Sequence, residues 1–357
     1  MKQYGVIMAG GGGTRFWPLS RQKNPKQLIN LSGKELLVNE AVDRMSTVIE
    51  KDNIFIVTSE VQTSAMKEAT KSRVLSDHIL SEPAARNTTA CIGFSAMEIV
   101  KKYGDGVMIL TPADHYIENV PELTKFFKLA LKTAEEQDKL VTIGLKPNFP
   151  STGFGYIKYD KNGGDVTTVL EYREKPDEET AKQYIDSGEY AWNSGMFIWK
   201  ASLILKKIKQ YAPDIYEQLE TIGEAMNGEE EQKVIHDVYP NIRSISIDYS
   251  VMEKCASTGD VLVIPGDCGW NDVGSWDMMD ILHKPDDKGN VFLGDVTGIG
   301  VNNTVAYSTG RKIAVLDVEN LVVVETSDAV MVCRKDKAQD VKMIVDELKN
   351  QNRNDLL

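Results

Sequence analysis

The alternation of apolar and amphipathic segments near the N-terminus is the feature that most limits how this chain can fold. The apolar runs lie at 6–9, 54–58, 107–111 and 140–144. Amphipathic segments lie between them and after them, at 34–50, 60–71, 87–102 and 121–136. Continuous apolar strands need helices on both faces of their sheet, so this order predicts a β-α-β-α domain with a parallel sheet.

Four glycines follow the first predicted strand directly. Glycine lets backbone N–H groups approach an oxyanion closely, so Gly10, Gly11, Gly13 and the adjacent Thr14 predict a phosphate-binding loop. Every register of the dinucleotide motif G-x-G-x-x-G has a non-glycine at its last position, and no P-loop Gly-Lys-Ser/Thr follows. A dehydrogenase is therefore disfavoured.

Two cations accompany the glycines. Arg15 follows them directly, and Lys26 lies farther along a loop that Pro18 and Pro25 keep from becoming helical. The Arg15 guanidinium can donate two N–H groups to the β- and γ-phosphates of a nucleotide, and Lys26 can add a point charge to a departing pyrophosphate. The alternative for Arg15 is a surface ion pair.

The segment at 9–18, together with Pro25, Lys26 and Gln27, resembles the signature of the sugar-nucleotide pyrophosphorylases, a nucleotidyltransferase family. Seven further blocks fit the same family in the same order and extend the resemblance over nearly the whole chain. The blocks lie at 82–88, 112–115, 153–157, 174–176, 192–197, 246–249 and 269–276. The resemblance is to the members that transfer GMP from GTP to mannose 1-phosphate and so make GDP-mannose. Alternatives are another hexose or heptose 1-phosphate as acceptor, or a non-catalytic regulatory subunit that binds a nucleotide sugar.

Nucleotidyl transfer requires alignment and charge neutralisation more than a nucleophile, because the attacking phosphate oxygen is already an anion. Mg²⁺ bridges phosphate oxygens and usually takes only one or two protein carboxylates. The resemblance assigns Asp114 and Asp272 to Mg²⁺, although each residue read alone is more often a turn aspartate. Since Mg²⁺ prefers oxygen, His115 is expected to be a packing residue or to support a metal ligand without binding the metal itself.

The base can be recognised by Glu82, whose carboxylate can accept both N1–H and N2–H₂ of guanine. A solvent-exposed acid at this position is equally consistent with the residue type. Arg86, Asn87 and Thr88 begin the following helix, where they can contact ribose or base, or cap the helix.

On the sugar side, the resemblance implies that Lys175 binds the phosphate of the sugar 1-phosphate. It also implies that Glu174 and Asn193 bind the sugar hydroxyls and that Gly155 lets the ring approach the backbone.

The resemblance implies two domains. The first, at 1–285, is a Rossmann-like α/β nucleotidyltransferase domain with a mixed, mainly parallel sheet, whose sugar-binding part lies at about 150–200. The second, at 286–357, is a small left-handed parallel β-helix-like domain with a terminal helix. Its short valine-rich strands suit such a stack. Because this segment lacks clustered cations and convergent carboxylates, we expect it to supply packing and a homodimer surface and no chemistry.

Charge and cysteine content exclude several classes of function. With 41 basic against 53 acidic residues, the net charge of −12 argues against a nucleic-acid partner. The four cysteines form no C-x-x-C pair, which argues against a zinc site. No run of about 18 apolar residues and no leader pattern is present, so no membrane contact and a cytoplasmic location are expected.

Overall fold

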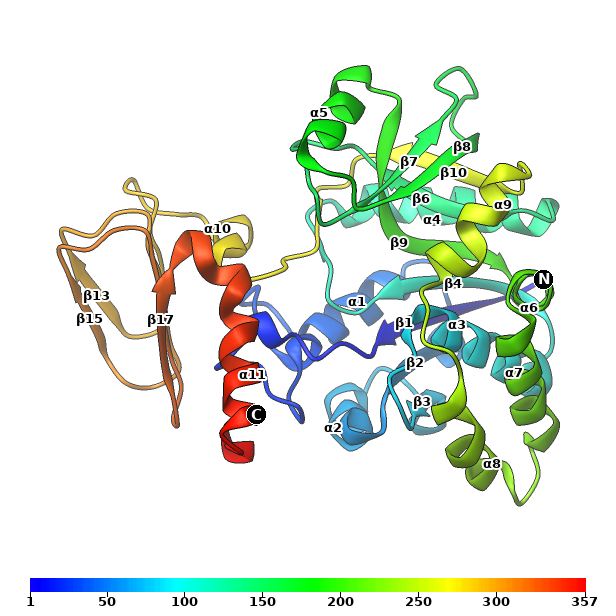
Figure 1. The fold of residues 1–357 in the computed structure, drawn as a ribbon, viewed down its shortest axis with the longest axis horizontal. Helices are drawn as coiled ribbons and strands as arrows, with labels where there is room; N and C mark the ends of the chain where they lie inside the picture. Colours follow the sequence, from blue (N-terminus) through cyan, green and yellow to red (C-terminus); the bar gives the residue numbers. More distant parts are fainter.

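The computed structural model describes all 357 residues and has a large body joined to a smaller C-terminal unit (Figure 1). A nine-stranded sheet forms the centre of the body. Its strands, in spatial order, are β3 (Ile79–Glu82), β2 (Ile54–Ser59), β1 (Lys2–Ala9), β4 (Gly106–Pro112), β9 (Tyr190–Lys200), β6 (Leu140–Leu145), β10 (Val261–Gly266), β8 (Thr167–Glu174) and β7 (Gly155–Tyr159). A separate two-stranded ribbon pairs β5 (Tyr116–Ile117) with β11 (Trp270–Asn271).

The sheet is mixed, as the sequence predicts. β3, β2, β1 and β4 are parallel, and so are β6 and β10. The strands of the predicted sugar-binding part run antiparallel to their neighbours, and β9 separates β4 from β6. Fewer strand pairs are therefore parallel than the apolar runs alone predict. The reason is that β9, from a later segment of the chain, lies between β4 and β6 and is antiparallel to both.

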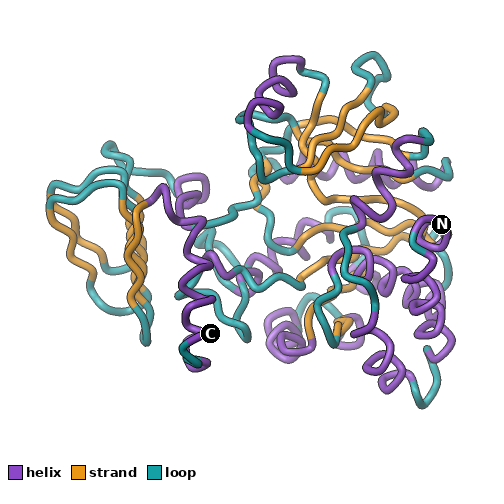
Figure 2. Tube along the Cα trace, in the orientation of Figure 1, coloured by secondary structure: helices purple, strands orange, loops and turns teal.

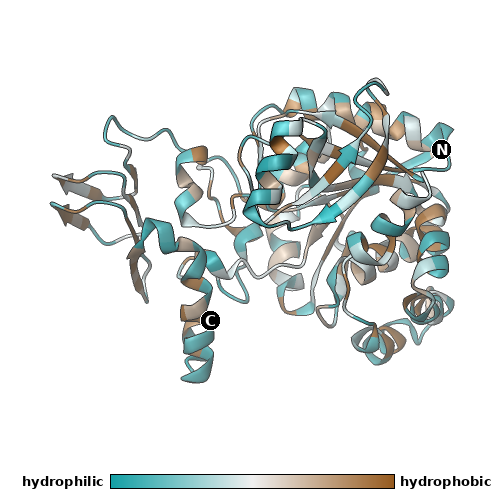
Figure 3. Cartoon of the chain, turned by 45° about the horizontal axis from the view of Figure 1, so that its top comes forward, coloured by the Kyte–Doolittle hydropathy of each residue, from teal (hydrophilic) through white to brown (hydrophobic).

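Helices cover both faces of the sheet, as the continuous apolar strands require. Val6 on β1 faces one core with α3, α6 and α7, whereas the next residue, Ile7, faces a second core with α1 and α4. Figure 2 shows these helices around the strands, and Figure 3 shows the apolar strands inside them. The helices of the body are α1 (Leu37–Met45), α2 (Glu60–Thr70), α3 (Asn87–Glu98), α4 (Val120–Glu136), α5 (Glu178–Ser187), α6 (Ala201–Tyr211), α7 (Pro213–Ala225), α8 (Glu231–Val238), α9 (Glu253–Ser257) and α10 (Met279–Leu282). None of the helices in the chain has the length and apolar character needed to cross a bilayer.

The C-terminal unit is a stack of short strands closed by a helix, which confirms the predicted β-helix-like architecture. β12, β14 and β16 pair in parallel, as do β13 and β15, and β17 adds an antiparallel edge. The elements are β12 (Val291–Leu293), β13 (Val296–Ile299), β14 (Val305–Ser308), β15 (Ile313–Leu316), β16 (Leu321–Glu325), β17 (Val330–Arg334) and α11 (Lys342–Asn350). In Figure 1, α11 lies between these strands and the body.

A third apolar core joins the two units. Phe16 and Trp17, which directly follow the glycine loop, are buried in it together with Trp276, Val341 and Val345. The ring centroids of Phe16 and Trp276 lie 5.2 Å apart, and the Trp276 indole N–H donates to the carbonyl of Trp17 at 3.1 Å. The backbone that carries Arg15 therefore depends on packing against the C-terminal unit.

We predict that Trp276→Ala lowers the free energy of unfolding by about 3–5 kcal/mol, because it leaves a cavity where the two units meet. Urea denaturation of the whole chain measures this loss. The matched control is Leu316→Ala on the outer face of β15, where the side chain is 65% exposed and the change should stay within about 0.5 kcal/mol. Equal losses in the two variants would contradict this account of the third core.

Candidate active site

A polar cavity of about 380 Å³ lies where the glycine loop, the loop after β4 and the loop after β11 meet. No apolar side chain lines it. Its lining residues are Gly13, Thr14, Arg15, Lys26, Asp114, His115, Asp272, Gly274 and Lys342. Six of these residues are assigned to phosphate or metal from the sequence, and the fold brings all six together from three separate segments: Gly13, Thr14, Arg15, Lys26, Asp114 and Asp272.

Lys26 holds the three segments together. Its ammonium group donates to the Asp114 carboxylate at 3.0 Å, to the Asp114 carbonyl at 3.1 Å and to the Asp272 carbonyl at 2.7 Å. The residue is only 4% exposed, and its ammonium lies 5.7 Å from the centre of the Phe16 ring. All three donors of the ammonium are thus satisfied within the protein.

The β5–β11 ribbon places both aspartates. Tyr116 pairs with Asn271, so the loop that carries Asp114 and the turn that carries Asp272 begin side by side. Burial would raise the pKa of Asp114, but the Lys26 ammonium beside it lowers the pKa below its usual value. Burial raises the pKa of Asp272, the Lys26 ammonium opposes that rise, and the nearby Asp114 carboxylate adds to it. Two carboxylates that repel each other in one cavity favour a bound cation between them.

This donor set fits Mg²⁺ better than a metal that needs a complete protein cage. The chain has no cluster of three or more acidic, histidine or cysteine side chains that could hold a metal. Mg²⁺ normally uses one or two protein carboxylates, such as those beside this polar cavity, since phosphate oxygens and water complete its shell. The Nδ1 atom of His115 accepts the Trp270 indole N–H at 3.0 Å, and burial lowers the pKa of His115 to about 4. His115 is therefore neutral, and its ring packs edge-on against Trp270 beside the cavity.

The glycine loop is held close to Lys26. Gly13 has a φ of 61°, and a Cβ there would lie 2.3 Å from the Cβ of Lys26, so no other residue fits. The buried Gln27 amide donates to the carbonyls of Ala9 at 2.6 Å and Gly11 at 3.0 Å. Arg15 is exposed beside this loop, and its side chain makes neither a hydrogen bond nor an ion pair. The surface ion pair considered for Arg15 does not form.

Glu82 lies at the end of β3 and is 7% exposed, so it is not the exposed acid that its residue type alone allowed. A Cβ built on Gly10 would lie 3.3 Å from its Oε2 atom, which places the carboxylate beside the glycine loop. The buried Tyr239 hydroxyl donates to Oε1. Burial raises the pKa of Glu82 to about 7, and the Tyr239 hydrogen bond opposes that rise.

The residues after Glu82 contact the segment at 240–247. The Arg86 guanidinium donates to the carbonyl of Pro240, and the Thr88 hydroxyl accepts the N–H of Ile247 at 2.8 Å. Asn87 begins α3 with a φ of 65°, and its side chain accepts the N–H of Thr88 at 2.7 Å. These contacts fix the start of α3 beside Glu82.

The predicted sugar residues converge around β7, β8 and β9. Gly155 pairs with Glu174 across β7 and β8, and a Cβ on Gly155 would lie 2.2 Å from the Glu174 carboxylate and 3.3 Å from Asn193. The Asn193 amide donates to Asp248 at 3.0 Å. Burial, and next the Asp248 charge, raise the pKa of Glu174 to about 7. Lys175 is exposed with a φ of 49°.

Some residues that hold or line these sites have no role assigned from the sequence, among them Gln27, Asp248, Tyr239 and Lys342. Gln27 and Asp248 lie in motifs that carried the resemblance, so a buried polar partner could have been expected for each. Tyr239 and Lys342 lie outside every motif, and only the fold brings Tyr239 to Glu82 and Lys342 to the polar cavity.

Comparisons with known proteins show which family this chain is similar to. The family model described as "Nucleotidyl transferase" matches residues 4–284, and the one described as "MannoseP isomerase/GMP-like beta-helix domain" matches residues 294–348. The chain is 39% identical over 351 residues to the xanthan biosynthesis protein XanB of Xanthomonas campestris pv. campestris, covering 98% of this chain and 74% of that protein. It is 37% identical over 356 residues to a mannose-1-phosphate guanylyltransferase of Escherichia coli, with the same coverage of the two chains.

A solved structure has the same architecture. The Thermus thermophilus protein described as a mannose-1-phosphate geranyltransferase superposes with a TM-score of 0.86 at 30% identity, covering 98% of this chain and 100% of that chain.

We predict that Glu82→Gln removes a pH-dependent loss of stability. Because the folded-state pKa is raised from 4.5 to about 7, the contribution of Glu82 to stability is complete below about pH 4.5 and is lost as the pH rises to 7. The variant cannot ionise, so it should exceed the wild type by roughly 3 kcal/mol at pH 8 and by no more than about 1 kcal/mol at pH 5.

Urea denaturation at the two pH values measures this difference. Glu217→Gln, on the exposed face of α7, is the matched control and should show no pH-dependent change. An equal effect of Glu82→Gln at pH 5 and pH 8 would contradict the burial argument.

Proposed function

The chain belongs to the nucleotidyl transferase family and is a nucleotidyltransferase enzyme, and from this premise we propose that it transfers GMP from GTP to α-D-mannose 1-phosphate. The products are GDP-mannose and pyrophosphate. The observation that carries the proposal is the single polar cavity in which Arg15, Lys26, Asp114 and Asp272 meet. The named relatives supply the choice of base and sugar.

The reaction is an in-line displacement at the α-phosphorus of GTP. An oxygen of the mannose 1-phosphate forms the new P–O bond, the bond to the bridging oxygen of the β-phosphate breaks, and pyrophosphate leaves with that electron pair. The attacking oxygen is already ionised, so no proton has to be removed and no covalent enzyme intermediate forms. Arg15 neutralises charge on the leaving pyrophosphate, while Lys26 holds the three loops in position and adds its positive charge to the cavity.

We assign Asp114 and Asp272 to one Mg²⁺ ion. When bound, Mg²⁺ neutralises phosphate charge as a Lewis acid. The repulsion between the two carboxylates supports this assignment, as does the free hydrogen-bonding capacity of Asp272, whose carbonyl, and not its carboxylate, accepts from Lys26.

Two further carboxylates, those of Glu82 and Glu174, form part of the proposed base and sugar sites. Glu82, held by Tyr239 beside Gly10, accepts the two donors of guanine, and these donors favour the ionised form of a carboxyl whose pKa is near neutrality. Glu174 and Asn193 bind hydroxyls of mannose, and Lys175 binds its phosphate. Arg86, Asn87 and Thr88 hold the ribose end of the nucleotide site. The homodimer and the cytoplasmic location stay predictions.

The test is a panel assay of pyrophosphate release with each of GTP, ATP, UTP and dTTP against mannose, glucose and heptose 1-phosphates. We expect GTP with mannose 1-phosphate to exceed every other pair in kcat/KM by at least about 100-fold, the discrimination that unpaired buried polar groups can give. A different preferred pair would replace the proposed specificity, and no turnover with any pair would favour a regulatory subunit.

We predict that Asp114→Asn or Asp272→Asn alone lowers kcat by at least about 100-fold while the fold persists, because each removes a charged ligand of the same ion. The double variant should lose far less than the product of the two single losses, because one ion cannot be lost twice. A loss in the double variant equal to the product of the two single losses would exclude a shared metal. A wild-type rate that is unchanged by chelation of divalent ions would exclude it as well.

A further inference from the structure

One residue of the C-terminal unit lines the polar cavity that contains Arg15 and Lys26. Lys342, the first residue of α11, lines the cavity with Arg15 and Lys26. No chemistry is expected of this unit from its sequence, because its cations are not clustered there. The fold places one of them at the site.

The three cations of the cavity are not equivalent. The Lys26 ammonium directs its three donors at Asp114 and Asp272. Arg15 and Lys342, in contrast, have no carboxylate partner and make no side-chain hydrogen bond, whereas Lys337 and Lys349 nearby pair with Asp340 and Asp346. The positive charge of these two unpaired cations is therefore available to bind an anionic ligand in the cavity.

Lys342 is held in place by the contacts of its neighbours. Val341 and Val345 are 2% and 6% exposed in the third core beside Phe16 and Trp17. The Gln339 amide donates to the Ser275 hydroxyl at 2.6 Å, next to the turn that carries Asp272. The position of Lys342 relative to the glycine loop is thus set by buried packing, although its own side chain is exposed to the cavity.

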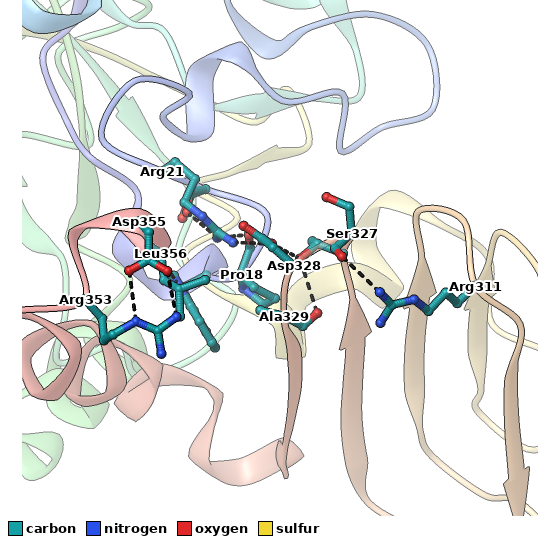
Figure 4. A network of polar contacts seen from close by, with 12 residues as sticks. Pro18, Arg21, Arg311, Ser327, Asp328, Ala329, Arg353, Asp355 and Leu356 are labelled. Carbon is teal, nitrogen blue, oxygen red and sulfur yellow. Dashed lines mark hydrogen bonds and ion pairs between the residues drawn. The ribbon is translucent and has the colours of Figure 1, made fainter. Parts of the chain in front are cut away.

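Polar contacts add to this packing on the far side of the loop. Figure 4 shows Arg21 directed at Asp328 in the turn before β17, with a distance of 2.9 Å between the guanidinium and the carboxylate. The Trp17 indole N–H donates to the carbonyl of Leu356 at 2.9 Å. The segment after the glycines is therefore fixed to the C-terminal unit at several points.

We propose that Lys342 is a pyrophosphate-binding residue that acts with Arg15 on the β- and γ-phosphates of the nucleotide and on the departing pyrophosphate. The identity of the leaving group rests on the proposed function. Pyrophosphate carries several negative charges near neutral pH, more than Arg15 alone can balance once Lys26 is bound to Asp114. The ammonium of Lys342 supplies further positive charge from the C-terminal wall of the cavity.

The test measures binding of inorganic pyrophosphate to the whole chain by calorimetry, at fixed Mg²⁺ and low ionic strength. Lys342→Met should weaken binding by about fivefold, the effect of one screened charge at about 4 Å. Lys342→Arg should bind within about twofold of the wild type because it keeps the charge. The matched control, Lys349→Met, removes one charge from the same helix and should leave binding unchanged.

Two further readouts separate charge from structure. The difference between Lys342→Met and the wild type should shrink in about 1 M salt, where the screening length is about 3 Å. In turnover, Lys342→Met should raise the KM for the nucleoside triphosphate and leave the KM for the sugar phosphate unchanged. The proposal would be overturned if Lys342→Met bound pyrophosphate as tightly as the wild type. It would also be overturned if Lys342→Arg lost as much affinity for pyrophosphate as Lys342→Met.

The pyrophosphate-binding test of Lys342 can be distinguished from a test of the proposed function. A wild type that turns over no GTP with mannose 1-phosphate, yet binds pyrophosphate in a way that depends on the charge at 342, would overturn the proposed reaction and support the role of Lys342.

Discussion

The ammonium of Lys26 is the contact on which the site depends. It joins the glycine loop to the loop after β4 and to the turn after β11, and no other side chain contacts both Asp114 and Asp272 through hydrogen bonds. Because the ammonium itself is buried, its hydrogen bonds to Asp114 and Asp272 favour the arrangement of the three loops seen here. Gly13 makes the arrangement possible because any side chain there would collide with Lys26.

The C-terminal unit has a second role beside its own folding. Its apolar core does not close on itself but takes in Phe16, Trp17 and Trp276 from the body. A loop rich in glycine would otherwise be costly to order, since glycine loses more conformational entropy on folding than any other residue. Burial of the two aromatic residues that follow the glycines offsets this cost and fixes the backbone at Arg15.

Much of this could be predicted from the sequence, because local signals were strong. Apolar runs located β1, β2, β4 and β6, and the motifs located Arg15, Lys26, Asp114 and Asp272, which the structure brings into one cavity. The insertion of β9 between β4 and β6 could not be predicted, since strand order depends on long-range pairing. Tyr239 and Lys342 carried no local signal: a tyrosine on a short helix and a lysine on an amphipathic one are ordinary surface residues until the fold gives them neighbours.

The hydrogen bond from Trp17 to Leu356 joins residues 339 positions apart, and this separation has a consequence for how the protein matures. A ribosome adds about 5–20 residues per second, so the glycine loop is exposed for tens of seconds before α11 exists. During that interval the loop lacks the packing that fixes Arg15. The packing and the hydrogen bond that fix the backbone at Arg15 are thus completed only when the last residues of the chain have been added.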